Sequence, residues 1–161
     1  MTKTIETQRF TSELFDLLDE TFLHVQGIYL DKDTSLFETL ETISAAEASR
    51  PVSATCASVA AQVAHVNFYL EVLERFLRTN ETVRADWGEI WRTTREVTPE
   101  EWSASKDRLR QSYQRVLETL RSIEDWNGEN AIAGALAIVV HSAYHLGEIR
   151  QALCTIKQAG S

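Results

Sequence analysis

Residues 130–157 read NAIAGALAIVVHSAYHLGEIRQALCTIK, and this stretch decides the fold of the chain. Its core-facing positions recur at the three- and four-residue spacing of an α-helix. Those positions are Ile132, Ala135, Val139, Ser142, Leu146, Ile149, Leu153 and Ile156. Residues 131–140 are apolar on almost every side, which is typical of a helix surrounded by other helices. We therefore predict one long central helix over 130–157, with other helices packed around it.

Three more amphipathic helices are predicted upstream of the central one. The first covers about 10–29 and the second about 55–78, each with apolar residues at alternating spacings of three and four. Thr98 opens the third helix, because Pro99 follows at the first helical position and Glu101 completes a capping box. Four long amphipathic helices predict an all-α fold, a four-helix bundle.

Residues 30–54 form a predicted long connection between the first two helices. Within it, residues 36–43 could form a short helix. Pro51 ends this helical tendency, because proline biases the residue before it away from the helical conformation. Ser53 or Thr55 is then the expected N-cap of the second long helix.

The length of 161 residues and the net charge of −8 bound the class of protein. This length suits a single domain over residues 1–161. The acidic balance argues against nucleic acid and anionic membrane surfaces as partners, since both need a basic face. No run reaches the roughly 18 apolar residues of a spanning helix, and no apolar signal core follows Met1, which favours a cytoplasmic protein. Cys56 and Cys154 suggest no disulfide framework.

Three histidines carry the functional signal. His141 and His145 are four residues apart and Glu148 is three further on, so they share one face of the central helix. His65 lies on a second, mostly apolar face of the helix over 55–78. Burying three imidazoles without partners costs about 1–3 kcal/mol each, whereas a bound metal ion would satisfy all of them. We therefore predict a metal site held by His65, His141 and His145.

Other metal and haem sites do not fit this pattern. A carboxylate-bridged di-iron site needs Glu-x-x-His on two helices, and c-type haem attachment needs Cys-x-x-Cys-His; the chain has neither. A zincin motif needs a glutamate where the chain has Ser142. Cys56 and Cys154 each lie nine residues from a site histidine, half a turn out of phase, so we expect small packed side chains pointing away from the histidines. We expect His24 to be structural.

A small-residue stretch from Ser58 to His65 (SVAAQVAH) and the motif His141-x-x-x-His145-x-Gly147 stand in two different predicted helices. Together they resemble the DinB-like (YfiT-like) metalloprotein superfamily. The resemblance implies a four-helix bundle with a long crossover connection, often dimeric. It also implies a divalent metal held by the three histidines, with water in the open positions. Members with assigned activities are similar to thiol-dependent transferases and isomerases that use bacillithiol, mycothiol or glutathione.

Glu148 departs from the family pattern, in which a glutamine often follows the glycine. Its carboxylate could be a fourth ligand, could orient a ligand imidazole, or could act as a base. We take it as the candidate catalytic residue. The nitrogen-rich ligand set suits zinc, nickel, iron or cobalt.

The sequence leaves two hypotheses for the function of this protein. The first is a metal-dependent enzyme, a thiol-dependent transferase or a hydrolase, with a small-molecule substrate, a low-molecular-weight thiol among the candidates, and a homodimeric assembly. The alternative is a metal-stabilised or metal-free bundle that acts as a binding or dimerisation module without catalysis. Trp87, Trp91 and Tyr69 are candidates for a pocket rim; the two tryptophans could equally form a satellite hydrophobic cluster under a loop.

Overall fold

The computed structural model describes residues 4–81, 84–94 and 96–158, and within these residues the chain forms seven helices and no strand. The prediction of an all-α fold is confirmed. Four helices are long: α1 (Thr7–Phe22), α4 (Val59–Thr79), α6 (Pro99–Arg121) and α7 (Ala131–Gln158). Three are short: α2 (Leu36–Glu41), α3 (Ala45–Ser49) and α5 (Glu89–Thr93).

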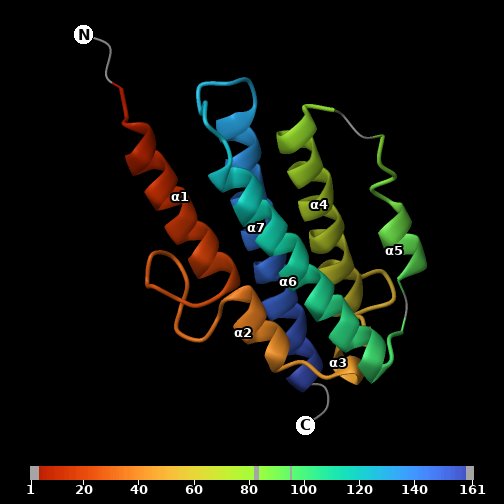
Figure 1. Ribbon diagram of the computed structural model, residues 1–161. Coiled ribbons are helices and arrows are strands. Elements are labelled where there is room, and N and C mark those ends of the chain that lie inside the picture. Colours follow the sequence, from red (N-terminus) through yellow and green to blue (C-terminus); the bar gives the residue numbers. More distant parts are fainter. Residues whose placement is uncertain (1–3, 82–83, 95, 159–161) are drawn as a thin grey trace.

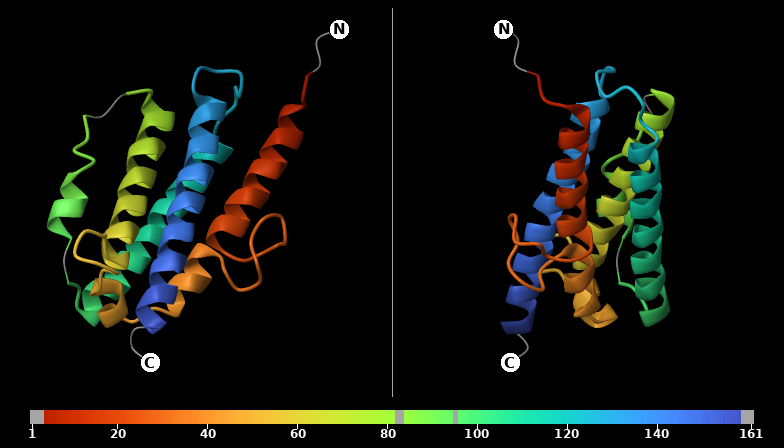
Figure 2. Two further views of the ribbon diagram at one scale, coloured as in Figure 1. Left: turned by 180° about the vertical axis from the view of Figure 1, so that it is seen from behind. Right: turned by 60° about the vertical axis from the view of Figure 1, so that its left-hand side comes forward.

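The four long helices lie side by side along a common direction (Figures 1 and 2). α4 and α6 run the same way, and α1 and α7 run the opposite way. Because α4 and α6 are parallel neighbours, the chain between them must return along the molecule, and α5 lies on the outer side of α4 on this return (Figure 1). The long connection after α1 carries α2, the short helix expected within 36–43, and α3.

α7 contributes one face to the core, and the prediction that other helices surround its apolar stretch is wrong, because Leu136 and Val140 are 40% and 66% exposed. The helix packs against α4 and α1. The predicted core-facing positions of this helix are buried, except Ile132, which is 42% exposed. The buried side chains of α7 therefore lie between α1 and α4.

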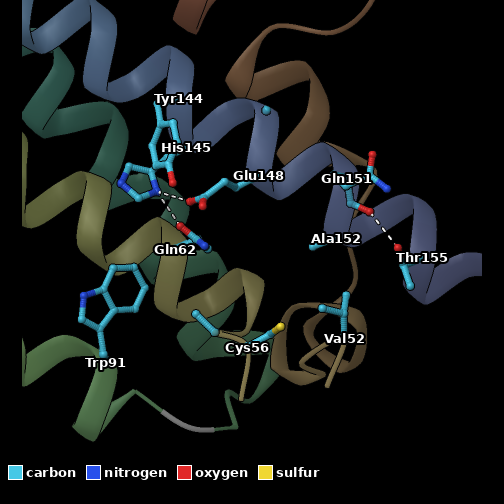
Figure 3. A pocket seen from close by; sticks show the side chains of 12 residues that line it. Val52, Cys56, Gln62, Trp91, Tyr144, His145, Glu148, Gln151, Ala152 and Thr155 are labelled. Carbon is cyan, nitrogen blue, oxygen red and sulfur yellow. Dashed lines mark hydrogen bonds and ion pairs between the residues drawn. The ribbon is translucent and has the colours of Figure 1, made fainter. Parts of the chain in front are cut away.

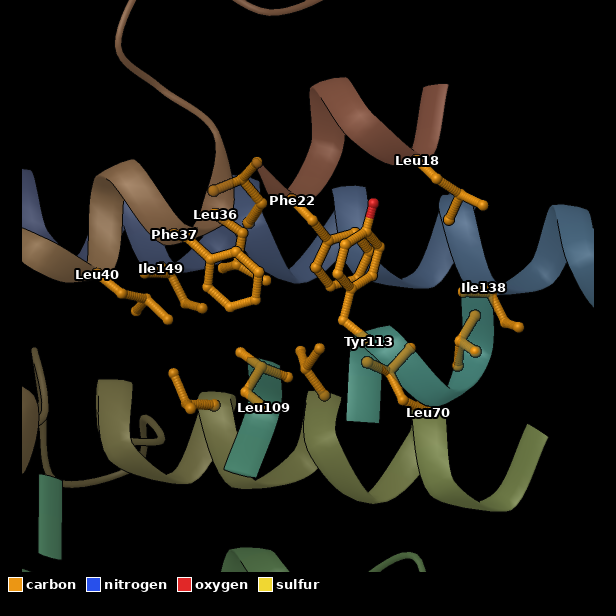
Figure 4. Close-up of a cluster of buried hydrophobic side chains, with 14 of the residues drawn as sticks. Leu18, Phe22, Leu36, Phe37, Leu40, Leu70, Leu109, Tyr113, Ile138 and Ile149 are labelled. Atoms are coloured by element: carbon orange, nitrogen blue, oxygen red, sulfur yellow. The ribbon is translucent and has the colours of Figure 1, made fainter. Parts of the chain in front are cut away.

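Aromatic side chains fill the core where α1, α2 and α6 meet (Figure 4). Phe22 stacks on Tyr113 with ring centroids 4.4 Å apart, and Phe37 meets the Tyr113 ring edge-on at 6.1 Å. All three rings are buried, and burial raises the pKa of the Tyr113 phenol above its usual value. Such aromatic pairs contribute about 0.5–1.5 kcal/mol beyond the area that they bury.

α7 is also the one helix in the described part of the chain that is long and apolar enough to cross a membrane by length and composition. Its most apolar window has a mean hydropathy of 1.3, and 44% of that window is buried inside the protein. The core helix of a soluble protein passes the same test. The hydropathy and the burial of this window therefore do not identify a membrane span.

The start of α6 is as predicted. The hydroxyl oxygen of Thr98 accepts a hydrogen bond from the N–H of Glu101 at 3.2 Å, and the Glu101 carboxylate accepts one from the N–H of Thr98 at 2.8 Å. Pro99 is the first residue of the helix. One turn in, the indole N–H of Trp102 donates to the carbonyl of Ile43 at 2.8 Å, which ties this end of α6 to the chain after α2.

The first helix ends earlier than predicted, because α1 stops at Phe22 and does not reach residue 29. The cause is the buried Glu20 carboxylate, which accepts hydrogen bonds from four backbone N–H groups at 2.6–3.1 Å. The four donors belong to Gln26, Ile28, Tyr29 and Leu30. A helix would direct these N–H groups to backbone carbonyls, so the carboxylate holds the segment as a loop. Gly27 adopts a φ of +85° within it, a conformation that favours glycine.

The second long helix begins later than predicted. Its N-cap is Ser58, and neither Ser53 nor Thr55 takes this role. The hydroxyl oxygen of Ser58 accepts a hydrogen bond from the N–H of Ala61 at 3.2 Å. The residues just before Ser58 therefore lie outside the helix.

The two cysteines differ from their prediction. Cys56 lies before α4, where its N–H donates to the carbonyl of Ser53 at 3.1 Å. The predicted direction of the Cys56 side chain assumed that Cys56 and His65 lie on one helix. Cys56 lies outside α4, so helical spacing does not set its direction. Cys56 and Cys154 are both free and exposed, so the prediction of packed side chains is wrong.

Candidate metal centre

Three histidines meet where α4 packs against α7. His65 comes from α4, and His141 and His145 come from consecutive turns of α7. One possible ligand atom from each ring lies within 4.8 Å of the other two. The structure brings together the three residues that the sequence singled out, and their geometry could hold a metal ion. His24 lies outside this group, exposed and paired with Asp19 at 3.1 Å.

Ring nitrogens of the group lack protein partners. His65 Nδ1 and His141 Nε2 are buried and make no hydrogen bond among the described residues. The side chains are also well enclosed, since His65 and His145 are 8% and 5% exposed. An unpaired buried nitrogen costs free energy, and coordination to a divalent ion would offset this cost. The residues present therefore fit a bound metal.

Burial keeps the three imidazoles neutral. Desolvation, and after it the neighbouring rings of His145 and His65, lower the pKa of His141 to about 3. Desolvation also lowers the pKa of His65, with help from His145, and lowers that of His145 against the opposing effect of Glu148. Neutral rings have free lone pairs, so near pH 7 the group can bind a metal without first losing protons.

Two side chains hold the Nδ1 atom of His145 (Figure 3). Gln62 Oε1 lies 2.6 Å from this nitrogen and Glu148 Oε2 lies 2.9 Å from it. Both oxygens are acceptors, so Nδ1 carries the ring proton and Nε2 keeps the lone pair. Metal-binding histidines are commonly oriented through the far ring nitrogen in this way.

The contacts of Glu148 narrow the roles that the sequence left open. Its carboxylate contacts the imidazole of His145 and is not a member of the three-histidine group. This contact supports the orienting role; a catalytic role stays a prediction. Gln62 was not predicted from the sequence, although it lies three residues before His65 on the same helix. Residues three apart on a helix share a face, as His145 and Glu148 do, and this spacing is the signal that could have indicated Gln62.

Gln62→Leu is expected to lower zinc affinity by about 10–100-fold, because loss of a residue that orients a metal ligand typically costs this much. Competition with a chromophoric zinc chelator measures the change. Gln151→Leu is the matched control, since Gln151 is exposed on α7 and makes no contact with His145 among the described interactions. Equal affinities for both variants and the wild type would show that Gln62 does not orient His145.

Aromatic rings enclose the histidine group. Tyr69 stacks on His141 with centroids 3.5 Å apart and an angle of 12° between the ring planes. Trp91, on α5, lies 4.5 Å from the His65 ring, and Trp87 lies 6.4 Å from it. Both tryptophans are partly exposed. Trp87 and Trp91 therefore cover the His65 side of the histidine group.

A pocket of about 770 Å³ opens beside His145 (Figure 3). This volume is within the range of small-molecule sites. Trp91 and Glu148 line it. Cys56 lines it as well, although its spacing predicted a side chain that points away from the histidines. The remaining lining residues are Val52, Ala57, Gln62, Tyr144, Gly147, Gln151, Ala152 and Thr155.

Fold and site together define a class: all-α proteins in which two packed central helices bring together three histidines able to hold a metal ion. The family model of the DinB superfamily matches residues 30–149, about three quarters of the chain and all three histidines. The chain belongs to the DinB superfamily, as the sequence resemblance indicated. Searches of curated proteins and of solved structures found no match.

Proposed function

We propose that this protein is a divalent-metal-dependent enzyme of the thiol-dependent transferase type, acting on a small molecule in the cytoplasm. The observation that supports this proposal is the three-histidine group, whose donor atoms lie within 4.8 Å of one another beside a pocket of about 770 Å³. Three protein ligands leave coordination positions open, as in catalytic sites, whereas structural zinc sites have four.

His65, His141 and His145 would hold the ion, and their nitrogen donors suit zinc, nickel or iron. When bound, such an ion lowers the pKa of a coordinated thiol or water and makes it nucleophilic near neutral pH. Gln62 and Glu148 fix the orientation of the His145 ring through its Nδ1 proton.

Glu148 is the proposed proton acceptor. Its side chain is 36% exposed and lines the pocket, so it can take a proton from a molecule bound there. A phenol is already protonated at neutral pH, and the hydrogen bond to the Glu148 carboxylate raises the pKa of the Tyr144 phenol further above its usual value. The pocket therefore presents a proton acceptor and a proton donor next to the histidine group.

The proposal is tested with purified protein loaded with zinc. One assay supplies 2-mercaptoethanol and chlorodinitrobenzene, and a second supplies nitrophenyl acetate for hydrolysis. We expect thiol conjugation that is lost on chelation and restored by zinc, and that Glu148→Gln slows without loss of bound zinc. One zinc per chain with no activity in either assay would instead favour a module without catalysis.

A dimerisation module is the second candidate, and the outer face of α7 favours it. Ile132, Leu136, Val140 and Tyr144 are exposed at a spacing of four, which aligns them along the helix. None of the side chains that α7 exposes between residues 131 and 147 is charged, although the chain carries a net charge of −8. Two copies of this chain can meet through this face, in two-fold symmetry, without bringing acidic groups together.

Val140→Glu is expected to convert a homodimer into a monomer of 18.3 kDa, because the 66% exposed valine lies in the middle of this face. A buried unpaired charge should weaken dimerisation by about tenfold or more. Light scattering during gel filtration, over a series of protein concentrations, measures the mass. Gln158→Glu, also exposed on α7, should remain dimeric. A monomeric wild-type protein at all concentrations would rule out this interface.

A further inference from the structure

We infer that the pocket beside the three histidines takes uncharged organic molecules with an apolar or aromatic body and discriminates against those that carry a carboxylate or phosphate. This inference rests on the proposed function and names the class of substrate for the same site. It concerns the pocket walls away from the histidines, which are built from the loop before α4, from α5 and from the last turns of α7.

The described residues that line the pocket offer no positively charged side chain. Glu148 is the charged residue among them, and its charge is negative. Proteins recognise carboxylates and phosphates chiefly with arginine and lysine. On the walls away from the ion, an anionic group on the substrate body would therefore find no cationic side chain as a partner and would be repelled by Glu148. The net charge of −8 acts in the same direction over longer distances.

Hydroxyl groups on the pocket wall and beside it already have hydrogen-bond partners. The Thr155 hydroxyl donates to the carbonyl of Gln151 at 3.1 Å, as Figure 3 shows. The Tyr144 hydroxyl is hydrogen-bonded to Glu148. At the amino end of α4, the Ser58 side chain caps the first turn and takes up one of its free N–H groups. The neutral donors that remain are the side-chain amides of Gln62 and Gln151 and the indole N–H of Trp91, and none of them carries a positive charge.

The end of the pocket far from His145 combines apolar side chains with the polar Gln151 and Thr155. Figure 3 shows His145 and Glu148 at one end, and Val52 and Ala152 across the pocket from them. Nearer the histidines, Trp91 adds a flat aromatic surface that is 36% exposed, with its ring centroid 6.3 Å from that of His145. A molecule held by its reactive atom at the histidine end would place its body against these side chains, where burial of apolar area is favourable.

The test uses the protein loaded with cobalt(II), whose absorption spectrum changes when a thiol binds. Two probes of equal shape are titrated, phenylmethanethiol and its para-carboxylate. We expect the uncharged thiol to bind at least about tenfold more tightly, because like charges brought together in a binding site cost this much or more. The spectrum reports binding without any need for turnover.

Thr155→Arg places a cation on the pocket wall, and Gln158→Arg places the same charge on α7 outside the pocket lining. Thr155→Arg should raise the affinity of the carboxylate probe by about tenfold, and Gln158→Arg should not. If the carboxylate probe binds wild-type protein as tightly as the uncharged one, or Thr155→Arg does not favour it, the inference is wrong while the metal site stands. If cobalt does not bind at all, the proposed function fails and the inference fails with it.

Discussion

His141→Ala is expected to leave the chain without stoichiometric zinc, whereas the wild-type chain binds about one ion. The His141 ring lies 5.1 Å from that of His65 and 4.4 Å from that of His145, so its removal leaves one ligand on each of two helices. Loss of a residue that only orients a ligand costs about 10–100-fold in metal affinity, and loss of a ligand should cost more than about 100-fold. Elemental analysis after dialysis and a chelator competition measure the effect.

His24→Ala is the matched control for this experiment. His24 is exposed and its partner is Asp19, outside the three-histidine group. We expect this variant to bind zinc as the wild type does. Circular dichroism of both variants establishes that the helices are intact. Retention of one zinc ion by folded His141→Ala would contradict the metal centre.

Glu20→Gln is expected to destabilise the fold by about 3 kcal/mol. The Glu20 carboxylate is buried and accepts four backbone hydrogen bonds, and hydrogen bonds to a charged group contribute about 1.5–3 kcal/mol each. Glutamine keeps one acceptor oxygen and turns an NH₂ group toward backbone donors, so at least two of the four bonds are lost. Urea unfolding at neutral pH, followed by circular dichroism, gives the difference in the free energy of unfolding.

The effect of Glu20→Gln should depend on pH. Burial by itself raises the pKa of Glu20, but the four backbone N–H groups together hold it below the ordinary 4.5. A carboxyl group with a lowered pKa stabilises the folded state above the unfolded-state pKa, and this stabilisation is lost as the pH falls through the folded-state pKa. The wild type should thus lose stability below pH 4.5. Glutamine at position 20 does not titrate. The difference in the free energy of unfolding between wild type and variant should therefore narrow as the pH falls below 4.5.

Asp16→Asn provides the comparison on the same helix, because Asp16 is exposed on α1. An exposed substitution of this kind changes stability by no more than about 0.5 kcal/mol. A Glu20→Gln protein that unfolds at the same urea concentration as Asp16→Asn would show that the carboxylate does not hold the loop after α1.

The features predicted from the sequence are those that depend on spacing along one helix. The core-facing side chains of α7 follow from their three- and four-residue spacing, whereas the expected neighbours on nearly every side of residues 131–140 are not found among the described residues. The Thr98 capping box is complete within four residues. The histidines converge because each lies on a secondary apolar face of a helix, and in a bundle two such faces have to meet.

The features that were missed depend on contacts with distant residues or on where an element begins. α1 has helical periodicity past Phe22, but the Glu20 carboxylate competes for the N–H groups that would continue the helix. The role of Gln62 depends on His145, which is 83 positions away. The place of Cys56 in the pocket depends on the helix beginning after Ser58. Periodicity contains none of this information.

The separation of the histidines between α4 and α7 also sets an order of events during synthesis. A nascent chain that has exposed α4 and α6 to solvent contains only His65 of the three site histidines, because His141 and His145 lie in α7, downstream of both helices. The centre can form only after α7 has left the ribosome and docked against α4. An ion that needs all three histidines could therefore be captured only when α7 docks against α4, and uptake of zinc during refolding would report this docking step.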